Sequence, residues 1–239
     1  MSIETRERAA RNIFEGGSFK IDLETGFKIA LHDDLPEAPL SPFYLNLRPD
    51  GVKEGVLTKE DIVWIALSMH QLCKRNKLFT TSRPICSIPA AGDPFLDEML
   101  DIMERASSLD RNLLPKRIRL KKIVPGKRPL ALDESSQGAW QNTLLVDDLV
   151  ASLLTKNLAI GAIEGVGGSV TDLLVFLNRS ADARARLAAR GITLHAVWEF
   201  EHLMEWALGQ GYLTRTQHEV IMEYPATLAA YKRSVGYDK

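Results

Sequence analysis

The chain has 239 residues, of which 45% are hydrophobic and 26% charged, as is ordinary for a globular protein. A formal net charge of −1 gives no overall attraction to nucleic acid or to an anionic membrane. No apolar run reaches the roughly 20 residues of a membrane helix, and the charged N-terminus lacks the apolar segment of a signal peptide. Two cysteines, Cys73 and Cys86, imply no disulfide framework and favour a reducing compartment. We therefore expect a cytoplasmic protein with no nucleic-acid or membrane partner.

The first 57 residues predict one helix followed by short strands. Helical pattern runs from Glu4 to Phe14 and stops at Gly16. Alternating runs, typical of strands, occupy residues 19–23, 26–31 and 41–48, with a Pro-rich acidic loop over 32–40.

From Thr58 onward, helical and strand patterns alternate. Thr58 is placed as the N-cap of a strong helix over Lys59–Arg75. Buried strands are predicted at 84–89, 117–120, 143–146, 170–177 and 192–197. Further helices are predicted at 94–107, 155–164, 181–190 and 201–208, then one capped by Thr214 or Thr216 and a short last one opened by Pro225. This alternation indicates right-handed crossovers and an α/β fold with a parallel sheet.

The motif around which the chain is organised is an apolar strand that ends in two acids, Asp147 and Asp148. A small loop follows, and a helical pattern begins near Thr155. Ligands of open α/β sheets bind beyond the carboxyl ends of the strands. Two carboxylates there can accept hydrogen bonds from ribose hydroxyls or hold Mg²⁺ directly or through water, and the next helix can offer N–H groups to a phosphate. The motif indicates a ribose-phosphate site; an acid pair that caps the helix or is simply solvated is the alternative.

Other motifs are less informative. The glycine-rich run 165–168 follows a helix and precedes a strand, the wrong context for a dinucleotide fingerprint. The five histidines show no metal-ligand spacing. A basic run is either a local anion site or a solvated loop, and it lacks the stacking aromatics of a nucleic-acid site. Its members are Lys116, Arg117, Arg119, Lys121, Lys122, Lys127 and Arg128.

Several segments, in the right order, resemble the orotate phosphoribosyltransferase family. They are Leu144–Leu149 with the helix after it, Val170–Arg179, Arg184–Leu187 and Gly191–His195, preceded by 26–28, 41–48 and 87–94. The resemblance implies a type I phosphoribosyltransferase fold, with a parallel sheet flanked by helices. It implies a single domain, with a small N-terminal hood in residues 1–57 and an α/β core in 58–239, and usually a homodimer. The implied reaction joins orotate to phosphoribosyl pyrophosphate with Mg²⁺, giving orotidine monophosphate and pyrophosphate in pyrimidine biosynthesis.

The resemblance also implies roles for individual residues. Asp147 and Asp148 would bind the ribose diol or Mg²⁺, and Arg179 would meet the pyrimidine carboxylate. The 5′-phosphate would lie on Ala151, Ser152, Leu153, Leu154 and Thr155, the base on Lys28, Phe43 and Tyr44, and the pyrophosphate on Ala91 and Gly92. Catalysis would fall to Asp148 with Arg119 and Lys122, the last two in a mobile loop that often serves a neighbouring subunit.

Two departures from the family pattern keep a second function open. The phosphate loop is usually T-T-G-G-S, whereas residues 151–155 contain no glycine; residues 152–156 instead resemble a glycine-free T-K-A-D-S-K version of the loop. The basic loop matches the family only at Arg119 and Gly126, and Asn178 replaces the usual Asp. The leading prediction is orotate phosphoribosyl transfer. The alternative is a homologue that binds a nucleotide or phosphosugar without transfer, as a regulatory protein. A transferase for another base, and fusion or partnership with a decarboxylase, also stay open.

Overall fold

The structure is a computed structural model that describes residues 3–79, 83–106, 114–123, 130–136, 138 and 140–237. The chain forms two compact units: Met1–Ala9 with Thr58–Phe200, and Ala10–Leu57 with Glu201–Lys239. Each unit has its own buried residues and is described by itself. Among the described helices, none is long and apolar enough to cross a membrane.

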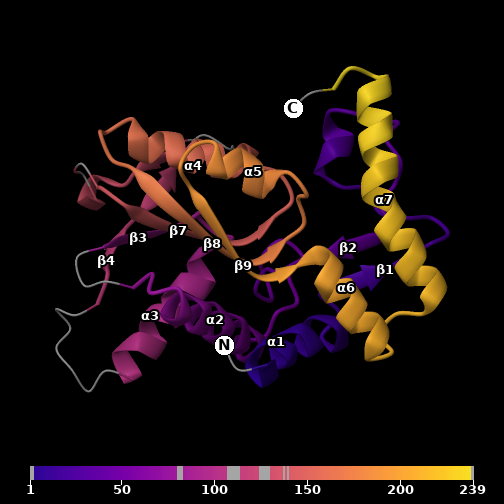
Figure 1. Cartoon of the computed structure of the whole chain (residues 1–239), viewed down its shortest axis with the longest axis horizontal. Coiled ribbons are helices and arrows are strands. Elements are labelled where there is room, and N and C mark those ends of the chain that lie inside the picture. Colours follow the sequence, from indigo (N-terminus) through magenta and orange to yellow (C-terminus); the bar gives the residue numbers. More distant parts are fainter. Residues whose placement is uncertain are drawn as a thin grey trace. The chain divides into compact units, whose positions relative to one another are not determined.

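The first unit is built on a five-stranded parallel sheet, which confirms the predicted α/β class. Its strands are β3 (Pro84–Ser87), β4 (Lys116–Ile118), β7 (Thr143–Val150), β8 (Val170–Asn178) and β9 (Thr193–Glu199), in the order β4-β3-β7-β8-β9 (Figure 1). The central strand β7 places Leu145 between Cys86 of β3 and Leu173 of β8. All three side chains are fully buried, as the continuous apolar run of β7 predicts for a strand covered on both faces.

Helices cover both faces of this sheet. Figure 1 shows α2 (Lys59–Arg75) and α3 (Asp93–Ala106) on one face, and α4 (Leu154–Glu164) and α5 (Ala183–Ala188) on the other. The predicted cap of α2 is confirmed: Thr58 Oγ1 accepts from the Asp61 N–H at 3.2 Å, and the Thr58 N–H donates to Asp61 Oδ2 at 2.8 Å. This reciprocal capping box satisfies two backbone donors that the first turn would otherwise leave free.

The predicted strand over 117–120 is interrupted. It splits at Arg119 into β4 of the main sheet and β5 (Leu120–Lys122), which pairs with β6 (Leu130–Leu132) in a two-stranded antiparallel sheet. The Arg119 N–H donates to Ser136 Oγ at 2.9 Å, outside either ladder, so the chain changes sheets at this residue. The rest of the basic run, 124–129, lies outside the described residues.

The second unit contains the end of α1 (Ile3–Glu15), two short strands and two C-terminal helices. β1 (Phe19–Ile21) pairs antiparallel with β2 (Phe43–Leu45), a 3₁₀ turn spans Ala30–Asp33, and α6 (Phe200–Gly209) precedes α7 (Arg215–Ser234). Aromatic rings form much of its core: Phe19 stacks on Phe43 with centroids 5.3 Å apart, and Phe14 stacks on Tyr212 at 5.2 Å.

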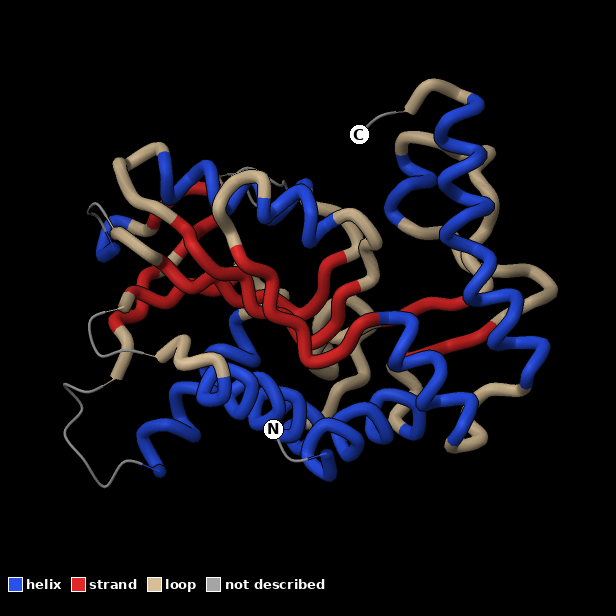
Figure 2. The backbone as a smooth tube through the Cα atoms, viewed as in Figure 1, coloured by secondary structure: helices blue, strands red, loops and turns tan. Residues whose placement is uncertain are grey.

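Three local predictions are wrong in their boundaries. Residues 26–31 form no strand, because only Phe27 bridges to Ser41 before the 3₁₀ turn begins. Pro225 does not open a helix but lies inside α7, which is capped by Thr214 and continues unbroken (Figure 2). The residues Ile221 and Tyr224, just before the proline, are buried, so their packing holds α7 where Pro225 lacks an N–H. The acid pair does not follow the central strand but belongs to it, since β7 runs on to Val150.

Candidate functional site

The acid pair lies near the carboxyl end of the central strand. Asp147 is paired in register with Val175 of β8, and its residue is only 1% exposed. Asp148 is half-buried, and its Oδ1 accepts the backbone N–H of Leu149 at 2.6 Å. Asp147 and Asp148 are consecutive residues of this strand, and their carboxylates lie close enough for the charge of Asp147 to act on Asp148. The extension of β7 therefore buries Asp147 while Asp148 stays partly accessible.

Asp147 has a partner that sequence reasoning did not identify. The ammonium of Lys156 lies 2.6 Å from Asp147 Oδ2, and Lys156 itself is 6% exposed. Burial alone would lower the pKa of Lys156, but the charges of Asp147 and Asp148 outweigh it and raise the pKa. The one signal in the sequence was a lysine in the first turn of the helix that follows the acids, a position that disfavours cations.

The proximity of these charges affects Asp148. Burial, followed by the negative charge of Asp147, raises the pKa of Asp148 to about 7, while Lys156 and the Leu149 N–H act in the opposite direction. Near neutral pH the two carboxyls therefore carry less than two full negative charges, and the lysine offsets much of the remainder.

The next helix begins without a side-chain cap. Leu153, the N-cap residue of α4, has φ −88° and provides no hydrogen bond from its side chain, as far as the described residues extend. Ala151 and Ser152 are exposed, Thr155 is half-buried, and Leu153 anchors the loop with 4% exposure. Unsatisfied N–H groups at a helix N-terminus, next to two hydroxyl side chains, form an arrangement that binds phosphate.

This loop also shows how a sequence without glycine can form it. Residues 151–155, all of which the structure describes, include none with a left-handed φ. Glycine is therefore not needed for the backbone conformation here. The two leucines of the loop lie in different surroundings. Leu153 is buried and anchors the loop, whereas Leu154 is 48% exposed.

The loop after β3 comes close to the acid pair. A Cβ on Gly92 would lie 2.4 Å from the Val146 carbonyl oxygen and 3.1 Å from Asp147 Cα, so only glycine allows this approach. Ala90 adopts a left-handed φ of 71°, which is strained for a residue with a side chain. Its N–H donates to Asp93 Oδ2 at 2.9 Å, and the hydroxyl of Ser87 donates to Asp93 Oδ1 at 2.5 Å. Gly92 therefore lies beside the acid pair, and the Asp93 carboxylate already accepts the N–H of Ala90 in the same loop.

Arg179 follows β8 at the same edge of the sheet. Its backbone N–H donates to the Val150 carbonyl at 2.7 Å, and its guanidinium lies 5.8 Å from the centre of the Phe200 ring. Arg179 therefore begins next to the end of β7, where the loop of Ala151 starts. The structure brings together Asp147, Asp148, the 151–155 loop, Gly92 and the Arg179 backbone at one edge.

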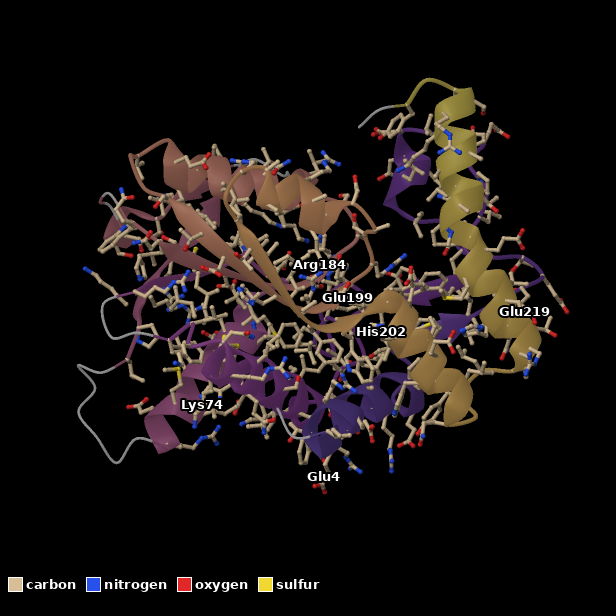
Figure 3. The ribbon with its side chains drawn as sticks, viewed as in Figure 1. Glu4, Lys74, Arg184, Glu199, His202 and Glu219 are labelled. Carbon is tan, nitrogen blue, oxygen red and sulfur yellow. The ribbon has the colours of Figure 1, made fainter. Side chains whose placement is uncertain are left out.

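A polar cluster of β8 and β9 adds Glu199, which sequence reasoning did not single out. The Asn178 amide donates to Glu199 Oε2 at 2.7 Å, and Arg184 Nε donates to Glu199 Oε1 at 3.1 Å. Figure 3 shows the side chains of Arg184 and Glu199 directed toward one another. Because Asn178 is uncharged, it places no second carboxylate against Glu199.

The remaining predicted site residues lie elsewhere. Arg119 is exposed where β4 and β5 meet, and Lys122 is half-buried at the end of β5. Lys28, Phe43 and Tyr44 belong to the second unit. There Phe43 is a core residue, 1% exposed, whereas the Tyr44 ring lies 5.9 Å from that of Phe27. Contact of these three with a base stays a prediction.

The acid pair does not fit Mg²⁺ as a direct ligand set. Within the described residues, no three His, Cys, Asp or Glu side chains are grouped to hold a metal ion. One oxygen of Asp147 is bound by Lys156, and the raised pKa of Asp148 leaves that carboxyl partly protonated near neutral pH. Mg²⁺ prefers ionised oxygen ligands, and often arrives bound to substrate phosphates. A Mg²⁺ ion carried by a pyrophosphate would not depend on Asp147.

Comparison with known proteins shows which sequences and folds the chain resembles. No protein-family model matches the chain. Over 108 residues it is 30% identical to an orotate phosphoribosyltransferase from Saccharolobus solfataricus, a match covering 45% of this chain and 53% of that protein. The chain therefore spans about half the length of this curated relative.

Solved structures match over more of the chain. The UMP synthase of Leishmania donovani superposes with a TM-score of 0.65 at 17% identity, over 92% of this chain and 41% of that one. The orotate phosphoribosyltransferase of Francisella tularensis superposes with a TM-score of 0.59 at 14% identity, over 94% and 93% of the two chains. The chain has the type I phosphoribosyltransferase fold and resembles the orotate phosphoribosyltransferase family.

Proposed function

We propose that the protein is an orotate phosphoribosyltransferase, acting in the cytoplasm as a homodimer in pyrimidine biosynthesis. The observation that carries the proposal is the acid pair at the end of β7, followed directly by the uncapped N-terminus of α4. A carboxylate accepts hydrogen bonds from sugar hydroxyls, and a free helix N-terminus binds phosphate. Ribose 5-phosphate presents both groups on one small molecule, with Ser152 and Thr155 available as further donors.

In the proposed reaction a ring N–H of orotate loses its proton to solvent, the nitrogen forms a bond to C1 of the ribose, and pyrophosphate leaves with the electrons of the broken C–O bond. Arg179 would bind the orotate carboxylate through its planar guanidinium. Arg119 and Lys122, contributed by the partner subunit, would stabilise the charge that develops on pyrophosphate. Ala91 and Gly92 would face that group, and Lys28, Phe43 and Tyr44 would line the base pocket. Asp148 would face the ribose as positive charge develops there.

Two contacts favour the alternative, a phosphosugar-binding homologue without transfer. Lys156 supplies a cation to Asp147, and Asp93 supplies an anion to the Ala90 N–H. Phosphoribosyl pyrophosphate with Mg²⁺ would bring a cation and an anion to these same two places. A protein whose own side chains already fill them would bind that substrate less strongly, while still holding the ribose phosphate at the N-terminus of α4.

The test is an assay of the purified protein with orotate, phosphoribosyl pyrophosphate and Mg²⁺, read out as orotidine monophosphate. Calorimetric titration of each ligand runs beside it. Product formation supports the transferase. Binding of phosphoribosyl pyrophosphate without product, with orotate and with other bases, supports the binding protein. Failure to bind phosphoribosyl pyrophosphate or orotidine monophosphate contradicts both.

A further inference from the structure

Lys156 occupies a position that is unfavourable for a lysine in two ways. Lysines are rarely fully buried, and a cation in the first turn of a helix is repelled by the helix dipole. Yet Lys156 is 6% exposed in the first turn of α4, with its ammonium 2.6 Å from Asp147 Oδ2. The position is therefore explained by what the ammonium contacts, the acid pair, and not by the helix.

The other oxygen of Asp147 is unsatisfied. Asp147 Oδ1 is buried and has no hydrogen-bond partner in the part of the chain that the structure describes. Leaving a buried acceptor unpaired is costly, so such an atom is expected to receive a donor. The same carboxylate touches Lys156 of the first turn, and this places the free oxygen beside the uncapped end of α4. A hydroxyl at the carboxylate and a phosphate at the helix would satisfy both sets of groups.

We propose that Lys156 is the resident cation of this site. Its ammonium supplies the positive charge that a divalent ion would otherwise bring to the acids, and it positions Asp147 so that Oδ1 accepts from a ribose hydroxyl. The inference rests on the proposed function and deepens it: the ligand is a pentose 5-phosphate, and its binding needs no divalent cation. Lys156 is a positioning residue that acts through Asp147.

The proposal predicts what happens when the ammonium is removed. Lys156→Met keeps a long apolar stem but leaves two adjacent carboxylates without a counter-charge. Such a pair attracts divalent cations. The variant should therefore gain a metal site that the natural protein does not have, a change that a merely structural lysine would not produce.

The first test measures Mn²⁺ binding by electron paramagnetic resonance, without any sugar ligand. Any Mn²⁺ that the natural protein binds should also be bound by Asp147→Asn, because the acid pair of the natural protein is expected not to bind the ion. Lys156→Met should bind Mn²⁺ at least about tenfold more tightly, and Lys156→Met with Asp147→Asn should lose the gain. Lys59→Met is the matched control, because Lys59 also lies in the first turn of a helix but is exposed. Asp147-dependent Mn²⁺ binding in the natural protein overturns the inference, even if Lys156→Met fails to fold.

The second test is calorimetric titration with ribose 5-phosphate, in EDTA and in Mg²⁺. The natural protein should bind equally within about twofold in the two buffers, whereas Lys156→Met should bind at least about tenfold more weakly in EDTA and recover in Mg²⁺. Binding by the natural protein that requires Mg²⁺ overturns the inference and leaves the proposed function standing. Absence of binding in both buffers overturns the proposed function instead, and the Mn²⁺ result still decides the role of Lys156.

Discussion

Asp172 of β8 and His195 of β9 are joined across the sheet, with His195 Nε2 2.7 Å from Asp172 Oδ1. The carboxylate can only accept, so the imidazole N–H donates. Arg83 binds the other oxygen of Asp172 and donates to the Thr171 hydroxyl at 2.8 Å. These residues lie toward the amino ends of their strands, away from the acid pair. The network holds neighbouring strands together and does not belong to the site.

Acid should weaken this network. Burial alone would raise the pKa of Asp172, but the His195 hydrogen bond and Arg83 outweigh it and hold the pKa far below its usual value. In the unfolded chain Asp172 is protonated below about pH 4, whereas in the folded chain it stays ionised to lower pH. The stabilisation is therefore fully present above about pH 4 and is lost progressively as the pH falls below it. Asp172→Asn should lower the free energy of unfolding by about 2 kcal/mol at pH 7, with a smaller difference at pH 3. Urea denaturation across this range measures it.

An exposed pair supplies the control for that experiment. Glu164 and Arg190 form a surface ion pair 2.9 Å long, so Glu164→Gln should change the unfolding free energy by less than about 0.5 kcal/mol. An Asp172→Asn effect that is equally small, or that does not change with pH, would show that the network is not a source of stability.

Asp148 should act in the opposite pH direction. Burial and the charge of Asp147 raise its pKa to about 7, so the folded state keeps a proton between about pH 4 and 7 that the unfolded state has lost. Its contribution to stability therefore falls as the pH rises through this window. Asp148→Asn stays neutral and should be more stable than the natural protein by about 1 kcal/mol at pH 8, but not at pH 4. Thermal unfolding of the variant and the natural protein at pH 4 and pH 8 measures this. The same difference in stability at both pH values would contradict the prediction.

A charge at the start of α4 should separate stability from phosphate binding. Leu154 is the first residue of the helix and is 48% exposed. Leu154→Asp should stabilise the protein by about 0.5 kcal/mol through the helix dipole, yet weaken ribose 5-phosphate binding about tenfold by repulsion. Leu154→Asn, similar in shape but neutral, is the control and should keep most of the affinity. If the charged variant binds as well as the neutral one, the phosphate lies elsewhere.

Arg179 should affect the base and not the sugar phosphate. Its backbone is fixed to Val150 at the end of β7, so Arg179→Ala removes the guanidinium without disturbing the strand pairing. Orotate affinity should fall by at least about tenfold, because a charged bidentate contact is lost, while ribose 5-phosphate affinity stays the same. Arg186→Ala, which removes only an exposed pair with Asp182 on α5, should change neither titration. Intact orotate binding in Arg179→Ala would remove the pyrimidine assignment.

Much of the local structure could be predicted from the chain itself. The helix over Lys59–Arg75 and its Thr58 cap agree with the structure, because capping and the 3.6-residue period are set within a few residues of each other. The apolar run from Thr143 identified a strand buried on both faces for a similar reason. Errors arose where distant packing overrides local preference, as in α7, which continues through Pro225 and has Ile221 and Tyr224 buried just before it.

The class of fold and the presence of two acids before a helix could be read from the chain, since period, capping and apolar runs are local properties. The strand order β4-β3-β7-β8-β9 and the extension of β7 that buries Asp147 depend on packing between distant segments, which the structure alone shows. It alone also placed the Lys156 ammonium on that carboxylate. Such contacts depend on how a strand, a loop and a helix pack against one another in three dimensions. No spacing along the chain states whether a lysine will face water or an acid.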